Sequence, residues 1–174
     1  MNSIFLLRLL RLILLLLFQV MVFNHIHLFG YITPLVIGYM VVCIHRNTSR
    51  TEILIWGFVI GLIFDMFSNT AGMAAGSCTL IAMIQPVLLN MLAPRDSADD
   101  LTPSFHTLGF WNYIFYVLLL MLVLHGLFYL LDAFTLANFL LTLISIIGST
   151  VLSTLIIVIM EFLIRPRKGA MYHM

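Results

Sequence analysis

Long apolar runs, separated by short polar breaks, make up most of this chain. A helix needs about 20 apolar residues to cross the hydrocarbon core of a bilayer. The runs predict six membrane-spanning helices, over residues 9–28, 31–45, 52–68, 71–92, 110–131 and 137–164. The second run is short for a span, and Pro34 stands in its first turn, where a missing N–H costs little. The pattern predicts an all-α integral membrane protein in which residues 1–174 form one polytopic domain.

The lysines and arginines orient the predicted helices, because these residues accumulate in the cytoplasmic loops of membrane proteins. With six spans and a cytoplasmic N-terminus, all of them fall on the cytoplasmic side, at Arg8, Arg11, Arg46, Arg50, Arg95, Arg165, Arg167 and Lys168. Without the short second helix, Arg46 and Arg50 would lie outside. The charges therefore favour six spans with both chain ends in the cytoplasm, a mobile cytoplasmic linker over 93–109 and a cytoplasmic tail over 165–174.

Composition agrees with lipid as the solvent of this chain. It is 63% hydrophobic and 9% charged, whereas about a quarter of the residues of a soluble domain are charged. The basic residues form no stripe, so nucleic acid is not an expected partner. Cys43 and Cys78 lie within apolar runs, which favours small buried side chains over a disulfide.

The densest group of candidate residues surrounds the end of the third predicted helix. Its members are Gly57, Gly61, Asp65, Ser68, Gly72 and Gly76. The first three share one helix face and predict close approach of another helix, and the last two repeat the glycine spacing on the fourth helix. A carboxylate at membrane depth needs a partner or a water-filled cavity. Asp65 is therefore either a proton or substrate site or, as we favour, a hydrogen-bond acceptor that caps a packed turn.

A second stripe of small residues lies on the sixth predicted helix, at Ser145, Gly148, Ser149 and Ser153. Steps of about four residues place them on one face, which predicts helix packing or partner docking. A serine nucleophile would need a neighbouring base, and no histidine or lysine falls at that depth on the same helix. Further along, Glu161 precedes Arg165 by four residues, a spacing typical of a surface ion pair.

The remaining polar residues in the apolar runs receive structural interpretations. Gln85 and Asn90 flank Pro86, and we expect them to satisfy backbone carbonyls that the proline leaves without donors. Three histidines have no carboxylate or cysteine beside them, namely His25, His27 and His125. We therefore expect no metal, no cofactor and no catalytic residue.

Taken together, these features resemble the rod shape-determining protein MreD family. The resemblance rests on a Leu-rich first helix after two arginines, a short second helix with an early proline, and the six-helix topology. Its specific motif is Gly61, Leu62, Asp65 and Ser68 at the end of the third helix, with Gly72 opening the next. The turn contains Met, Phe and Asn in place of the Leu- and Gly-rich family version.

The resemblance implies a non-enzymatic membrane scaffold of the cell-elongation complex in a bacterial inner membrane. The implied partners are an MreC-like bitopic protein, the actin-like MreB filament, a SEDS-type glycosyltransferase and a penicillin-binding transpeptidase, which guide side-wall peptidoglycan synthesis and rod shape. The resemblance also implies a fold similar to the substrate-binding subunits of energy-coupling-factor transporters.

Two other functions stay open at this point. A vitamin-binding transport subunit would need a polar outward-facing pocket and small residues on its first helix, which is instead rich in leucine. An intramembrane aspartyl protease would pair Asp65 with Asp132, both on the outer side in the six-span topology, although Asp132 lacks polar neighbours.

Overall fold

The computed structural model describes Leu14, Leu15, Leu17 and Gln19 together with residues 33–94, 101–132 and 139–164. All regular structure in this part of the chain is helical. The elements are η2 (Val36–Gly38), α2 (Tyr39–Val42), α3 (Arg50–Ser68), α4 (Met73–Leu92), α5 (Phe105–Leu108), α6 (Phe110–Asp132) and α7 (Phe139–Ile164). The predicted all-α class is confirmed for the described residues.

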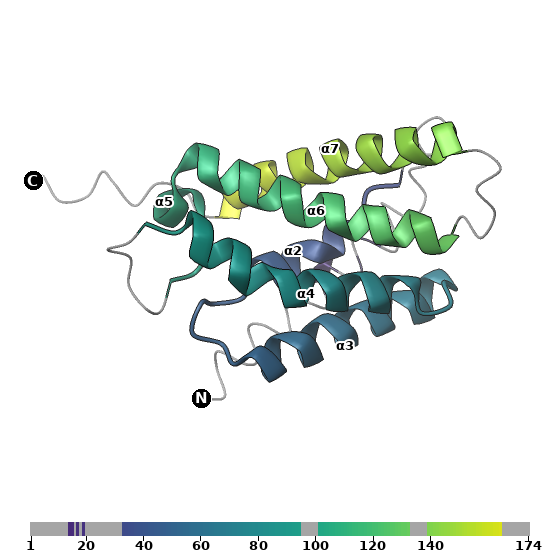
Figure 1. Cartoon of the computed structure of the whole chain (residues 1–174), viewed down its shortest axis with the longest axis horizontal. Helices are drawn as coiled ribbons and strands as arrows, with labels where there is room; N and C mark the ends of the chain where they lie inside the picture. The colour runs from purple at the N-terminus through teal and green to yellow at the C-terminus, as the bar shows by residue number, and fades with distance from the viewer. Residues whose placement is uncertain are drawn as a thin grey trace, which may run out of the picture.

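Four of these helices, α3, α4, α6 and α7, are long and apolar enough to cross a membrane. They lie in a layer in which α4 is between α3 and α6, and α6 is between α4 and α7 (Figure 1). Large apolar side chains such as Phe58, Met83, Phe115 and Ile147 are exposed on these helices, as a lipid environment allows. The protein is therefore a multi-pass membrane protein. The count of six spans and the orientation stay predictions.

The second predicted helix, over 31–45, is wrong in its extent. Residues 33–35 have no regular structure, and within 33–45, the described part of this span, helix is limited to the three residues of η2 and the four of α2. At 1.5 Å per residue these cover about 10 Å, far less than the roughly 30 Å of a bilayer core. Part of the reason is Pro34, whose ring disfavours helical geometry at the preceding residue, Thr33. The rest is that side chains from other helices bond the neighbouring backbone, as described below.

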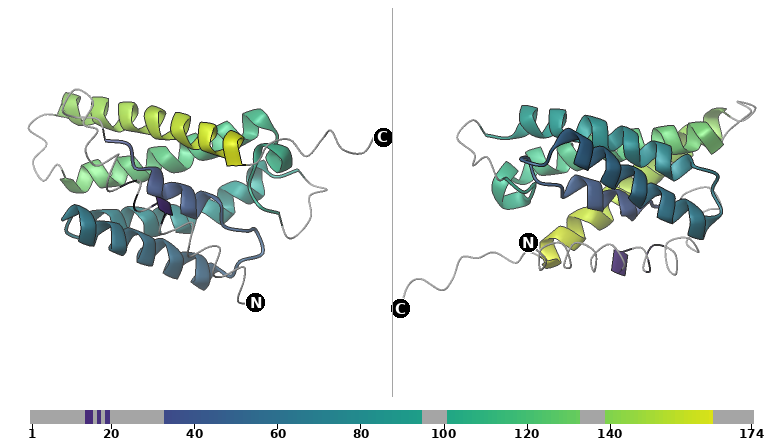
Figure 2. Two further views of the ribbon diagram at one scale, coloured as in Figure 1. Left: turned by 180° about the vertical axis from the view of Figure 1, so that it is seen from behind. Right: turned by 90° about the horizontal axis from the view of Figure 1, so that it is seen from below.

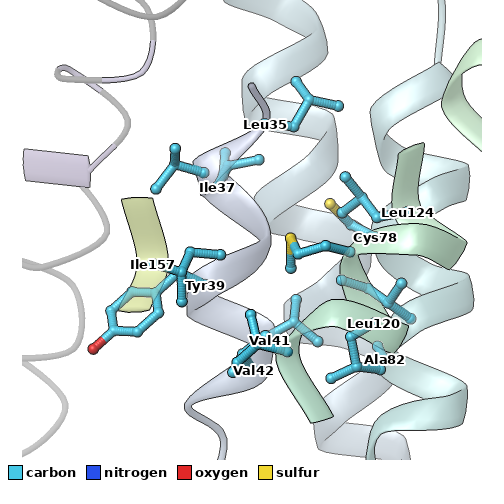
Figure 3. Close-up of a cluster of buried hydrophobic side chains, with 14 of the residues drawn as sticks. Leu35, Ile37, Tyr39, Val41, Val42, Cys78, Ala82, Leu120, Leu124 and Ile157 are labelled. Atoms are coloured by element: carbon cyan, nitrogen blue, oxygen red, sulfur yellow. The ribbon is translucent and has the colours of Figure 1, made fainter. Parts of the chain in front are cut away.

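This short segment lies against one face of the helix layer, in contact with α3 and α4 (Figure 2). Its apolar side chains form the core together with residues from all four long helices. Figure 3 labels Cys78 and Ala82 of α4, Leu120 and Leu124 of α6 and Ile157 of α7 among these partners. Cys78 is buried and Cys43 partly buried, and no disulfide joins them. The core is thus assembled around residues 35–42.

The predicted linker over 93–109 has structure of its own in its second half. Ser104 and Thr107 form a capping box at the start of α5, and the side chains of Leu101 and Leu108 are buried. The Leu101 carbonyl accepts a hydrogen bond from the Arg46 backbone N–H at 3.0 Å. Residues 101–109 are therefore docked onto the bundle, while the expected mobility of 95–100 falls outside the described residues.

Helices α3 and α4 pack with almost no space between their backbones at two glycines. A Cβ atom on Gly61 would lie 2.4 Å from the Ala74 carbonyl oxygen, and one on Gly57 would lie 2.6 Å from the Ala82 Cβ. Gly72 and Gly76 do not take part in this contact, although their spacing predicted it. Gly72 precedes α4 with a φ of +80°, and a Cβ on exposed Gly76 would meet only Leu131, at 3.8 Å.

Replacing Gly61 by Ala is expected to destabilise the protein by about 1–3 kcal/mol, because the new methyl group meets immobile backbone of α4. Thermal unfolding of the purified protein in detergent measures this loss. The matched control is Gly76→Ala, where the methyl group has room and alanine is the better helix former. Equal unfolding temperatures for the two variants would contradict the packing described for α3 and α4.

Candidate functional site

The backbone of residues 33–36 is held by side chains. The Thr33 N–H donates to the Ser149 hydroxyl at 3.1 Å and the Tyr129 hydroxyl at 3.2 Å. The Leu35 N–H donates to Nε2 of His125 at 3.3 Å. The Gln19 side-chain amide donates to the Pro34 carbonyl and accepts from the Val36 N–H, both at 2.8 Å. We call the side chains involved, with Ser153, the polar core: Gln19, His125, Tyr129, Ser149 and Ser153.

The polar core has a clear physical purpose in a membrane protein. Hydrocarbon offers no water to bond an unwound backbone, so each N–H and C=O must find a partner within the protein. An unpaired buried group of this kind costs about 1–3 kcal/mol. The polar core supplies partners from α6, from α7 and from Gln19, all brought to one stretch of four residues. Irregular backbone is thereby made tolerable inside an apolar bundle.

His125 uses both ring nitrogens within the polar core. Its Nδ1 lies 2.8 Å from the Met121 carbonyl oxygen, which can only accept, so Nδ1 carries the proton. Nε2 is then an acceptor, and it faces two donors at 3.3 Å, the Leu35 N–H and the Ser153 hydroxyl. Both are long for hydrogen bonds, as expected when two donors share one lone pair. The side chain of His125 is thus fixed in the neutral form that this arrangement needs.

The contact between Ser153 and His125 brings a base to α7 from another helix, whereas the sequence analysis considered only bases on the same helix. The base comes from α6, 28 residues earlier, and not from the same helix. A serine that bonds a histidine, where a third group orients the histidine as the Met121 carbonyl does here, is the arrangement found around activated serine nucleophiles. However, both side chains are completely buried, and the Nε2 lone pair also receives the Leu35 N–H. The pair, as it stands, serves the backbone of residue 35.

Replacing His125 by Leu should leave the Leu35 N–H and the Ser153 hydroxyl without this acceptor and cost about 1–3 kcal/mol of stability. Amide hydrogen exchange at Leu35 should rise at the same time, because opening of the segment becomes easier. The control is Ser145→Ala, since the Ser145 hydroxyl bonds the Leu141 carbonyl of its own helix and does not bond residues 33–36. Unchanged exchange at Leu35 would show that His125 does not hold the segment.

A second level of polar contacts continues along the same segment. The Tyr116 hydroxyl donates to the Val42 carbonyl at 3.1 Å, and the Gln85 amide donates to the Ile44 carbonyl at 3.2 Å. The Tyr39 hydroxyl donates to the Glu161 carboxylate at 2.6 Å. Glu161 therefore points into the bundle, whereas the pair predicted for it involves Arg165, which lies outside the described residues.

The expectation for Gln85 and Asn90 is wrong in its target. Gln85 bonds the carbonyl of Ile44 in another segment, and Asn90 accepts from Nε of Arg46 at 2.9 Å. Neither bond goes to the carbonyls that Pro86 leaves without donors in α4. Both side chains instead tie α4 to the chain that precedes α3. The side chains of Gln85 and Asn90 thus bond residues outside α4, although their position in the sequence suggested bonds within it.

Asp65 is almost completely buried and ties the end of α3 to the start of α4. One carboxylate oxygen accepts from the Thr70 hydroxyl and from the Ala74 N–H at 3.0 Å, and the other accepts from the Ala75 N–H at 2.8 Å. These N–H groups belong to the first turn of α4, where helical partners are missing and the helix dipole favours negative charge. Both oxygens are engaged in this cap, which is the arrangement favoured above over a proton or substrate site.

Replacing Asp65 by Ala should therefore destabilise the protein more than replacing it by Asn. The Asn side chain keeps one oxygen for the first turn of α4, while Ala leaves the N–H groups of Ala74 and Ala75 unsatisfied in an apolar environment. We expect a loss of about 1–3 kcal/mol for Ala in detergent unfolding experiments, and roughly half of it for Asn. If Asn is as damaging as Ala, the negative charge itself is what Asp65 contributes.

The other predicted site residues are distributed unevenly. Ser149 and Ser153 belong to the polar core, Ser145 bonds within α7, and Gly148 is partly buried. Ser68 is partly buried at the end of α3, and Asp132 is exposed at the end of α6. His25 and His27 lie outside the described residues. Within those residues no three His, Cys, Asp or Glu side chains are grouped so as to hold a metal ion.

Sequence reasoning missed the polar core as a unit, although it singled out several members. Gln19, Tyr129 and Pro34 lie in three different predicted helices and share no spacing. The available signal was the number of polar side chains inside apolar runs, since each of them needs a partner.

Comparison with family models, with characterised proteins and with solved structures finds no match for this chain. The resemblance described above therefore rests on the residues alone.

Proposed function

We propose that this protein is a non-enzymatic membrane scaffold of the bacterial cell-elongation complex, similar to MreD. The supporting observation is the use of its buried polar groups. The carboxylate of Asp65 and the side chains of His125, Ser149 and Gln19 all bond the chain's own backbone. A protein that uses its polar groups to fix its fold, and exposes apolar helix faces, is suited to docking other transmembrane helices.

In this proposal the chain resides in the inner membrane and binds an MreC-like bitopic protein. Through that partner it acts with MreB, a SEDS-type glycosyltransferase and a penicillin-binding transpeptidase in side-wall peptidoglycan synthesis. The Gly61, Leu62, Asp65 and Ser68 motif supports the family assignment. Six spans, cytoplasmic chain ends and a likeness to the substrate-binding subunits of energy-coupling-factor transporters belong to the same proposal.

A photo-crosslinking experiment in cells tests the proposal. A tagged chain carries a crosslinking amino acid either at Ile55 of α3 or at Val151 of α7, both exposed, or at buried Ile157 as the control. We expect an MreC-like protein to be captured from at least one exposed position and not from Ile157. Capture of an ATPase module alone would contradict the scaffold and favour a transport subunit.

A further inference from the structure

An open apolar groove of about 670 Å³ runs along the surface of the helix layer. Its floor is α4, with Gly76, Thr79 and Met83, and its walls include Phe58 and Leu62 of α3 and Leu127 of α6. Gly76 contributes to its depth, because the first neighbouring atom that a Cβ would meet is 3.8 Å away. Among the described lining residues, Thr79 alone has a polar side chain. The groove therefore fits a hydrocarbon occupant.

Two arginines lie at one end of the helices that form the groove. Arg50 is exposed and precedes the lining residue Leu54 by four positions, so the two share a face of α3. Asn90 follows Met83 by seven positions on α4, again on the same face, and accepts a hydrogen bond from Nε of Arg46 at 2.9 Å. The start of α3 and the end of α4 are both at the left-hand end of the helix layer in Figure 1, where the two helices diverge.

The described residues place two guanidinium groups, those of Arg46 and Arg50, toward this end of the groove. The nearest acid on α3 is Glu52, two residues from Arg50, and this spacing places it on the opposite side of the helix. An occupant that matches both the apolar groove and the arginines at its end has an apolar body and an anionic end. A guanidinium binds phosphate with two parallel hydrogen bonds, and basic sites at the ends of transmembrane helices bind anionic lipid headgroups.

We propose that the groove holds an acyl chain of an anionic glycerophospholipid whose phosphate contacts Arg46 and Arg50. An apolar transmembrane helix of a partner would fill the groove equally well, but it would bring nothing to the two guanidinium groups. The lipid matches both the apolar walls and the charge. This proposal does not depend on the scaffold function and would hold for a protein of another role.

Native mass spectrometry of the delipidated protein, mixed with phosphatidylglycerol and phosphatidylcholine of identical acyl chains, tests the lipid site. The wild-type protein should retain phosphatidylglycerol about tenfold or more over phosphatidylcholine, because both lipids carry the phosphate but the choline cation of phosphatidylcholine is repelled by the two arginines. The double variant Arg46→Gln, Arg50→Gln should lose this preference. Inorganic phosphate should not displace the lipid, because it lacks the acyl chain that fills the groove.

Substitutions in the groove distinguish lipid binding at this site from nonspecific binding of lipid to the protein surface. Gly76→Leu puts a side chain into open space and should reduce retention of both lipids at an unchanged unfolding temperature. Val151→Phe adds similar bulk to an exposed position of α7 that does not line the groove, and it should change neither lipid.

Equal retention of the two lipids by the wild-type protein would overturn the proposal. An unchanged preference in the arginine double variant would do the same. Capture of a protein helix by a crosslinker at Met83, with no lipid displaced, would assign the groove to a partner instead.

Discussion

The structure depends above all on satisfying an unwound backbone in a place without water. Residues 33–36 enter the centre of the bundle outside any long helix, and their N–H groups reach side chains of α6, α7 and Gln19. In a soluble protein ordered water could serve such groups, but the hydrocarbon core supplies none. The packing of α6 against α7 must therefore keep His125 and Ser149 within hydrogen-bond distance of this segment, and Ser153 within that distance of His125. The buried apolar side chains of residues 35–42 then complete the core around it.

The pairing of α3 and α4 follows a simpler rule. Without a hydrophobic driving force between helices in lipid, close backbone contact supplies much of the attraction, and glycine is what permits it. Gly57 and Gly61 bring α3 against α4, and one turn later the Asp65 carboxylate caps the first turn of α4. Packing and capping thus act on the same helix face. This hairpin is the part of the fold in which sequence spacing and tertiary contact agree best.

The interior and the surface of the bundle therefore have different roles. Polar groups inside the bundle are used to fix the chain's own backbone, whereas its outer faces are apolar, with Arg46 before and Arg50 at the start of α3. A scaffold that docks membrane partners needs a rigid interior and an exposed apolar surface. A site for an anionic lipid needs the same surface with positive charge beside it. The interior explains the stability, and the surface is where both proposals are made.

The sequence by itself determined the solvent, the long helices and the local motif. Apolar runs of membrane length predict α3, α4, α6 and α7, and four-residue spacing places Gly57, Gly61 and Asp65 on one face, because a helix repeats every 3.6 residues. It could not give the broken form of residues 33–42, the contact of Ser153 with His125 or the bond from Gln85 to Ile44. Periodicity describes only the faces of a single helix. Which faces meet, and which distant polar groups satisfy a backbone without water, was decided by the packing of the whole bundle.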